Sequence, residues 1–329
     1  MTACRKQIAL ILPVWAVLLA IMTALWSAPY LGGVLPDSDD YMRMVRVFDL
    51  IDGTDNGAHI QPRLGVGGQA EIAWSRLIDA PVLAVQAALE LFMERIPAAM
   101  VTTTIMPALM LLVLLAGLVW YTRPFVKDSN KSFFALLAVF FIWASLRQFM
   151  PGRVDHHMYQ IVLVVFAYGA LMRTWLAPER MLYPAITGLC FATGLAIGVD
   201  VLPWLALAAL LGGVFWLLRG AAFERTGRVT GTALLGGALL LHLLFSPSYT
   251  AVSCDALSPF WLALATVIAA FWFIVSFLPA GVKNAPVKRL LCGAVAGLPL
   301  LLVTYMVFPL CFHDPYMIEN PAVRDIWLS

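Results

Sequence analysis

The sequence predicts an all-α integral membrane protein, and three observations lead to this class. Of its 329 residues, 62% are hydrophobic and only 12% are charged. A soluble globular protein is nearer about half apolar and about a quarter charged. The apolar residues are gathered into runs close to the roughly 20 residues that a helix needs to cross a bilayer. The sequence has no basic patch of the kind that nucleic-acid binding needs, so no nucleic-acid partner is expected.

Nine apolar runs are predicted to be membrane spans. The first is too long for a signal peptide and lacks a small-residue cleavage site, so we interpret it as a retained helix. The region 181–218 is continuously apolar and admits more than one division into helices. The spans are expected at 7–27, 98–121, 133–149, 158–175, 181–199, 201–218, 230–247, 258–278 and 290–310.

The distribution of lysine and arginine favours a cytoplasmic N-terminus. With that end inside, most of the basic residues fall in short inner segments, as the positive-inside rule requires. The same segments hold only three acidic residues, Asp128, Glu179 and Glu224. Nine spans then place the C-terminus outside. We expect a single transmembrane domain over 1–329, with no soluble domain.

The first outer loop, 28–97, is the longest polar segment and is expected to carry two short interfacial helices. The stretch "LPDSDDYMRMVRVFDLIDG" has Asp37, Ser38 or Asp39 available as an N-cap. The stretch "WSRLIDAPVLAVQAALELFMERIP" places Asp79 before Pro81, which indicates a helix start near these residues. Between them lies a segment rich in glycine and polar residues, which we interpret as a loop.

Two acidic clusters face the same side of the membrane in this topology. Asp37, Asp39 and Asp40 follow the first span, and "DHH" at 155–157 follows the third. Carboxylates suit Mg²⁺ or Mn²⁺, and such a metal would neutralise charge on a phosphate leaving group. The alternative is that these acids are a solvated face or a helix cap. Ionisable groups at the end of a span more often have a partner or a function.

Cys254 and Cys311 both fall on the outer, oxidising side. They are candidates for a disulfide between the loop after the seventh span and the end of the ninth. Two free thiols at the membrane edge are equally compatible with the sequence, because spacing alone does not supply the geometry.

The order of these motifs resembles that of the oligosaccharyltransferase catalytic subunit, a member of the GT-C class of membrane glycosyltransferases. "SDDY" after the first span resembles the first acidic motif of that family. "GRVDHH" after the third span resembles its second motif. A group of bacterial membrane proteins is similar to the chain in "WSRLIDAP", "GRVDHHMYQ", "CDALSP" and "DPYMIENPAVRDIWLS". The resemblance covers essentially the whole chain.

The resemblance implies a fold, a reaction and a set of site residues. Asp39 matches the first-motif acid, which binds the metal and contacts the acceptor. Asp155 matches the first acid of the second motif, and His157 stands where the family has its second acid. The implied cofactor is Mn²⁺ or Mg²⁺. The implied reaction transfers a sugar or oligosaccharide from a polyprenyl-phosphate or pyrophosphate carrier to an acceptor on the outer face of a bacterial inner membrane.

Two arginines near the second motif are candidates for binding the carrier's phosphate. Arg147 and Arg153 flank that motif, and arginine binds phosphate through two parallel hydrogen bonds. The alternative is that they anchor the span end to lipid headgroups.

The chain departs from the family at its end. The family continues into a long outer loop, further spans and a soluble domain that holds the acceptor, whereas this chain stops at "IWLS". The second interpretation is therefore an inactive or truncated family member with a scaffold role. A transporter fits less well, because transporters place ionisable residues near the bilayer midplane and the runs here hold almost none.

Overall fold

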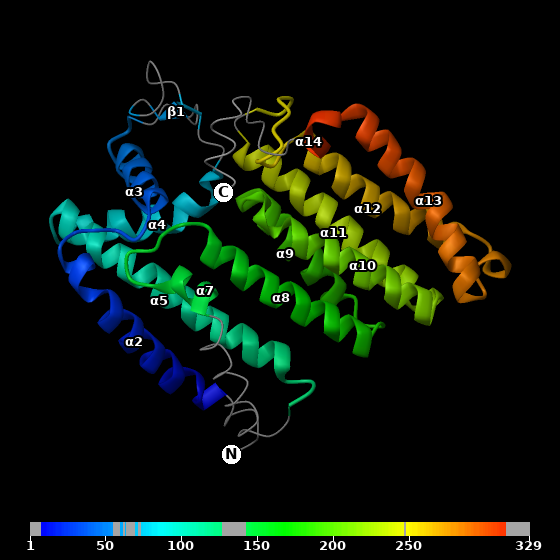
Figure 1. Cartoon of the computed structure of the whole chain (residues 1–329), viewed down its shortest axis with the longest axis horizontal. Coiled ribbons are helices and arrows are strands. Elements are labelled where there is room, and N and C mark those ends of the chain that lie inside the picture. The colour runs from blue at the N-terminus through cyan, green and yellow to red at the C-terminus, as the bar shows by residue number, and fades with distance from the viewer. Residues whose placement is uncertain are drawn as a thin grey trace. The chain divides into compact units, whose positions relative to one another are not determined.

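The computed structural model describes residues 8–54, 60–61, 63, 70–71, 74–126, 143–246 and 248–313. The regular secondary structure of these residues is helical apart from one pair of two-residue strands (Figure 1). Contacts divide the chain into two compact units, 1–169 and 170–329. The helices are α2 (Ile11–Leu31), α3 (Ser38–Ile51), α4 (Arg76–Glu90), α5 (Arg95–Thr122), α7 (Trp143–Leu146), α8 (His157–Leu176), α9 (Leu182–Ile197), α10 (Leu202–Arg219), α11 (Ala221–Phe245), α12 (Pro259–Phe277), α13 (Pro286–Val307) and α14 (Pro309–His313).

The first unit is built around α2 and α5. Leu18 and Met22 of α2 lie in one buried apolar cluster with Leu111 and Leu115 of α5. Polar side chains fix the pairing, because the buried hydroxyl of Tyr30 donates to a backbone carbonyl of α5. This packing holds the ends of α2 and α5, from which the first outer loop leaves and returns.

Two helices occupy the first outer loop, as predicted, and each begins at a polar cap. Asp37 caps α3 by accepting a hydrogen bond from the backbone N–H of Asp39 at 3.3 Å. The predicted start of the second helix near Asp79 is wrong. Ser75 caps α4 by accepting from Leu77 N at 3.2 Å, and Asp79 lies inside the helix, where it forms ion pairs.

The segment between α3 and α4 was interpreted as a loop, and the structure places two short strands there. β1 (Ile60–Gln61) pairs antiparallel with β2 (Ala70–Glu71). Most of this segment lies outside the described residues.

In the second unit, α11 packs against both α9 and α12 (Figure 1). Glycines let these helices approach closely, as is common between membrane helices. A Cβ at Gly188 of α9 would lie 2.3 Å from Thr230 O, and one at Gly231 of α11 would lie 2.8 Å from Ala269 Cα. Both positions therefore require glycine.

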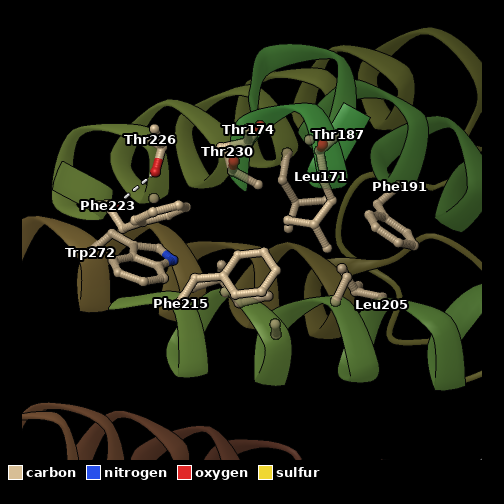
Figure 2. A pocket seen from close by; sticks show the side chains of 17 residues that line it. Leu171, Thr174, Thr187, Phe191, Leu205, Phe215, Phe223, Thr226, Thr230 and Trp272 are labelled. Atoms are coloured by element: carbon tan, nitrogen blue, oxygen red, sulfur yellow. Dashed lines mark hydrogen bonds between the residues drawn. The ribbon is translucent and has the colours of Figure 1, made fainter. Parts of the chain in front are cut away.

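A small cavity remains at the centre of the second unit (Figure 2). Its volume is about 50 Å³, and aromatic side chains that include Phe191, Phe215 and Trp272 line it. Its Thr226 hydroxyl already donates to Phe223 O at 2.8 Å (Figure 2). Ligand sites usually enclose about 300 Å³ or more, so we interpret this space as a packing defect.

Cys254 and Cys311 form a disulfide in the second unit, with Cα atoms 5.2 Å apart. This is one of the two arrangements that the sequence left open. The bond ties the segment before α12 to the short helix α14.

Six of the described helices are long and apolar enough to cross a membrane, so the chain is a multi-pass membrane protein. They are Arg95–Thr122, His157–Leu176, Val199–Arg219, Ala221–Phe245, Pro259–Phe277 and Pro286–Val307. Two shorter apolar helices, Ile11–Trp26 and Leu182–Ile197, correspond to predicted spans. Most of the predicted span 133–149 lies outside the described residues.

The predicted boundaries of the spans are wrong at one helix in particular. The seventh span was expected to begin at residue 230, but α11 begins at Ala221. The helix continues through charged residues because Glu224 is paired with Lys283, with Nζ and Oε2 2.8 Å apart. The ambiguous region 181–218 is divided at Gly198, where α9 ends.

Candidate functional site

Asp40 joins the two acidic motifs of the first unit. Its side chain is 0% exposed, and Oδ1 accepts the backbone N–H groups of Val154 at 2.8 Å and Asp155 at 3.0 Å. Oδ2 accepts from Arg153 Nη1 at 3.1 Å. The first turn of α3 therefore positions the backbone of the segment 153–155.

The turn that delivers this segment depends on Gly152. Its φ of +96° is unfavourable for residues with a Cβ. A Cβ there would also lie 2.7 Å from Pro36 Cδ. The N–H of Gly152 donates to Thr103 O at 2.9 Å, which anchors the turn to α5.

Arg153 lies between carboxylates. Its Nη1 lies 2.9 Å from Asp37 Oδ2, and its Nη2 lies 2.6 Å from Gln148 Oε1 and 3.5 Å from Asp155 Oδ2. The guanidinium thus sets one positive charge against the three carboxyl groups of Asp37, Asp40 and Asp155.

A second buried arginine connects the site to α4. Arg43 of α3 is 1% exposed and donates to Asp79 Oδ1 at 2.6 Å. Its other terminal nitrogen lies 3.7 Å from Asp155 Oδ1, and its guanidinium lies over the ring of Trp74. Arg46 approaches the second oxygen of Asp79 at 2.9 Å. Buried ion pairs of this kind favour a single arrangement of the side chains. Any arrangement that separates the partners leaves a buried charge uncompensated.

Asp155, His156 and His157 form a group that could hold a metal ion. One ligand atom from each lies within 4.8 Å of the others. His156 Nδ1 is 2.5 Å from Asp155 Oδ1, and His157 Nε2 is 3.3 Å from Asp155 Oδ2. The side chain of His157 is 37% exposed, so solvent reaches the group. One carboxylate and two imidazoles suit a transition-metal ion better than Mg²⁺, which prefers oxygen ligands.

Asp39 lies beside this group. Burial raises its pKa, and the negative charges of Asp155 and Asp37 raise it further. The two acidic motifs therefore lie close enough for their carboxylates to repel each other, and a bound cation would relieve this repulsion.

The carboxyl group of Asp155 is held ionised. Burial by itself would raise its pKa, but the hydrogen bond to His156 and the charges of His156, His157 and Arg43 outweigh burial and hold the pKa well below its usual value. Asp40 behaves differently, because burial raises its pKa to about 7 against the opposing charge of Arg153. Asp155 is thus ionised near neutral pH, which is the form of a carboxyl group that can bind a cation.

A cavity of about 510 Å³ lies next to these residues. Asp37, Arg147, Gln148 and Arg153 contribute its polar lining. Arg147 is exposed, in contrast to Arg153. The buried indole N–H of Trp26, another lining residue, has no hydrogen-bond partner.

Sequence reasoning singled out Asp39, Asp155, His157, Arg147 and Arg153, and the structure places all five in this part of the first unit. The roles given to these residues stay predictions. The pattern grouped Asp40 with the first acidic cluster without giving it a role of its own, and it assigned no site role to Arg43, Asp79 or His156. The spacing of residues could have indicated that Asp40 and Arg43 are buried. Asp40, Arg43 and Val47 recur every three or four residues, so they lie on one face of α3, and this face is buried.

Together, the fold and the site define a class of protein: a multi-pass helical membrane protein with an aspartate–histidine cluster where a span begins. No family model matches the sequence, and no curated protein matches it. Solved structures do. The chain matches, over nearly its whole length, the transmembrane part of an archaeal oligosaccharyltransferase, AglB from Archaeoglobus fulgidus, which is a GT-C protein.

Three of these structures show the extent of the likeness. The apo form has a TM-score of 0.62 and 15% identity, covering 97% of this chain and 38% of that chain. The complex with zinc and sulfate gives 0.62 and 17%, covering 91% and 40%. The complex with an inhibitory peptide and dolichol-phosphate gives 0.63 and 16%, covering 92% and 38%. This chain thus spans well under half the length of the oligosaccharyltransferase, and the likeness establishes the fold.

Proposed function

We propose that the chain is a GT-C-like glycosyltransferase. It would transfer a sugar or oligosaccharide from a polyprenyl-phosphate or pyrophosphate carrier to an acceptor on the outer membrane face. One observation carries the proposal: the Asp155–His156–His157 group could hold a metal ion, and it belongs to a fold like that of the oligosaccharyltransferase transmembrane part. Asp39 is near enough for the charge of Asp155 to raise its pKa. The matching oligosaccharyltransferase has been solved with zinc and with dolichol-phosphate, which are the ligand classes proposed here.

The residues of the cluster fit a divalent metal ion. Asp39, Asp155 and His157 are the proposed ligands, and His156 completes the donor set. We propose Mn²⁺ over Mg²⁺ because two imidazoles belong to the group. A bound ion would supply charge neutralisation at the phosphate that leaves the sugar.

Side chains of the protein would bind the carrier's phosphate, position Asp155 and contact the acceptor. Arg147 is exposed at the neighbouring cavity and would bind the carrier's phosphate. Arg153 was a second candidate for that role, but its contacts with carboxylates support a positioning role instead. Arg43 and Asp40 hold Asp155 in place from either side. The carboxylate of Asp39 would accept a hydrogen bond from the acceptor.

The orientation of the site is part of the proposal. We propose nine spans in a bacterial inner membrane, with the N-terminus inside. Asp155 and Cys254 are separated by four helices, α8 to α11, so an even number of crossings would place them on the same side. The disulfide of Cys254 supports an oxidising compartment on that side.

Metal binding tests the site first. We expect purified protein to bind Mn²⁺ in isothermal titration calorimetry. Asp155→Ala and His157→Ala should each lower the affinity at least ten-fold, because each removes a ligand. The matched control is Asp52→Asn, which removes an exposed acid of the same region that is paired with Arg95. Equal binding by all four proteins would contradict a site at Asp155.

The transfer reaction is tested with the loaded protein. We expect Mn²⁺-dependent transfer of a fluorescent sugar from a polyprenyl-pyrophosphate carrier in nanodiscs to an acceptor, with polyprenyl pyrophosphate as the leaving group. Arg147→Gln should weaken carrier binding while it leaves Mn²⁺ affinity unchanged. Metal binding without carrier binding would favour the alternative, an inactive family member with a scaffold role.

A further inference from the structure

A second cavity lies in the second unit, away from the residues of the proposed metal site. It is a groove of about 460 Å³ lined by α10, α12 and α13, and we call it the α10–α13 groove. Its lining is almost entirely apolar and includes Leu217, Phe271, Leu290 and Leu301. All three helices are among the candidate membrane spans, so the groove would open to lipid rather than to water.

Glycines make the groove hollow. A Cβ at Gly213 of α10 would meet no atom within 4 Å. On α13, Gly293 and Gly297 are four residues apart, and a Cβ at either would lie 3.4 Å or more from its neighbours. These glycines differ from Gly188 and Gly231, which hold helices together. They leave a space that none of the described side chains fills.

A positive charge marks one end of the groove. Arg289 in the first turn of α13 lines it and is only 8% exposed. Its three hydrogen bonds go to neutral carbonyls, two to Leu217 O and one to Lys283 O. Among the residues that the structure describes, no carboxylate lies within ion-pair distance of Arg289.

The surrounding charges do not neutralise Arg289. Lys283 is paired with Glu224, so this pair contributes no net charge. Lys288 adds an exposed cation next to Arg289, and its only described contact is Gly281 O at 3.5 Å. A guanidinium has five N–H donors, so Arg289 retains donor capacity after its three bonds. The end of an apolar groove therefore carries the positive charge of Arg289, and the exposed Lys288 precedes Arg289 in the sequence.

We propose that the α10–α13 groove binds one anionic phospholipid, with its phosphate headgroup at Arg289 and Lys288 and an acyl chain along Gly213, Gly293 and Gly297. Burial of the chain is favourable because it covers apolar surface that the protein leaves open. The two cations select an anionic headgroup over a zwitterionic one, as basic residues at a membrane surface do. The proposal is independent of the transfer reaction and of the metal.

The test compares lipids and variants in delipidated, detergent-solubilised protein. We expect phosphatidylglycerol to raise the thermal unfolding temperature, and phosphatidylcholine to raise it less. Gly213→Leu should abolish the difference, because its side chain fills the groove without a clash. The matched control is Gly236→Leu on α11, where a Cβ also meets nothing within 4 Å, and it should behave as the wild type.

The headgroup is tested separately. Lys288→Gln removes an exposed charge, so the fold should tolerate it, and the preference for phosphatidylglycerol measured by native mass spectrometry should fall about five-fold. Equal retention of the two lipids by the wild type would overturn the proposal. Retention that Gly213→Leu leaves unchanged would also overturn it, because the lipid would then be bound elsewhere.

Discussion

The carboxylate of Asp40 shows how one buried side chain builds the site. It accepts two backbone N–H groups from the second motif and one N–H from Arg153, so three donors converge on one group. Asp39, its neighbour in sequence, instead has its pKa raised by burial and by the negative charges of Asp155 and Asp37. The two aspartates of "SDDY" therefore have different roles, one structural and one proposed as a ligand.

Substitution of Asp40 should separate these roles. We expect Asp40→Ala to lower the free energy of unfolding by about 3–5 kcal/mol, because it leaves two buried N–H groups without an acceptor and removes one of the carboxylate partners of Arg153. Asp37→Asn removes a half-exposed partner of the same arginine, so it should cost about 1 kcal/mol or less. Thermal unfolding monitored by circular dichroism compares them. Equal effects would mean that Asp40 does not hold the segment.

Short elements, rather than long helices, decide the geometry of the candidate site. The turn at Pro151–Gly152 precedes α8 and places residues 153–157 against the first turn of α3. Its backbone has a positive φ, and Pro36 fills the space beside it. In the second unit, glycines on α9 and α11 instead serve close packing between helices.

Gly152→Ala tests the importance of this turn for the site. The added Cβ would be strained by the positive φ and would collide with Pro36, so the segment 153–157 should shift. We expect Mn²⁺ affinity to fall about 10- to 100-fold, the usual effect of disturbing groups that position metal ligands. Gly53→Ala is the control: Gly53 also has a positive φ, of 66°, but a Cβ there meets no atom. It should lower stability and leave Mn²⁺ affinity unchanged.

The chain as a whole places its charged chemistry and its apolar packing in different units. The first unit contains the described ion-pair network around Asp79 and Asp155. The second contains glycine-mediated helix packing, the α10–α13 groove and the disulfide. The proposed reaction and the proposed lipid site should therefore respond to different perturbations.

Loss of the disulfide in the second unit should lower stability without affecting the proposed metal site in the first unit. The bond joins residues 57 positions apart, so Cys311→Ser should lower the free energy of unfolding by up to about 4 kcal/mol. Mn²⁺ affinity should stay the same, because all proposed ligands lie in the first unit. Cys292→Ser, which removes a free thiol, is the control for thermal unfolding with and without reductant. A loss of Mn²⁺ affinity in Cys311→Ser would contradict this separation.

Much of the architecture could be predicted from local patterns. Long apolar runs identified the membrane helices because the cost of exposing polar backbone in lipid leaves few alternatives to a helix. The N-cap candidates Asp37, Ser38 and Asp39 located the start of α3 because a capping side chain acts within three residues, and the structure selects Asp37. The oxidising side suggested Cys254 and Cys311 as partners. Each of these signals depends on residues that are neighbours in the sequence or on the side of the membrane where a segment is predicted. A single sequence contains both kinds of information.

Other features depended on contacts between distant residues. Asp39 and Asp40 are the same residue type in adjacent positions, and only the packing of α3 against the 153–155 segment distinguishes them. Arg153 was expected to face a phosphate, but three acids from two segments surround it. Asp79 resembled a helix start and instead pairs with Arg43. Composition and hydropathy thus determined the class, the membrane helices and the cluster of candidate residues, because those signals are local. Tertiary structure decided which carboxylates are buried in ion pairs and hydrogen bonds and which face the candidate site. The difference depends on contacts between residues more than 100 positions apart in the sequence.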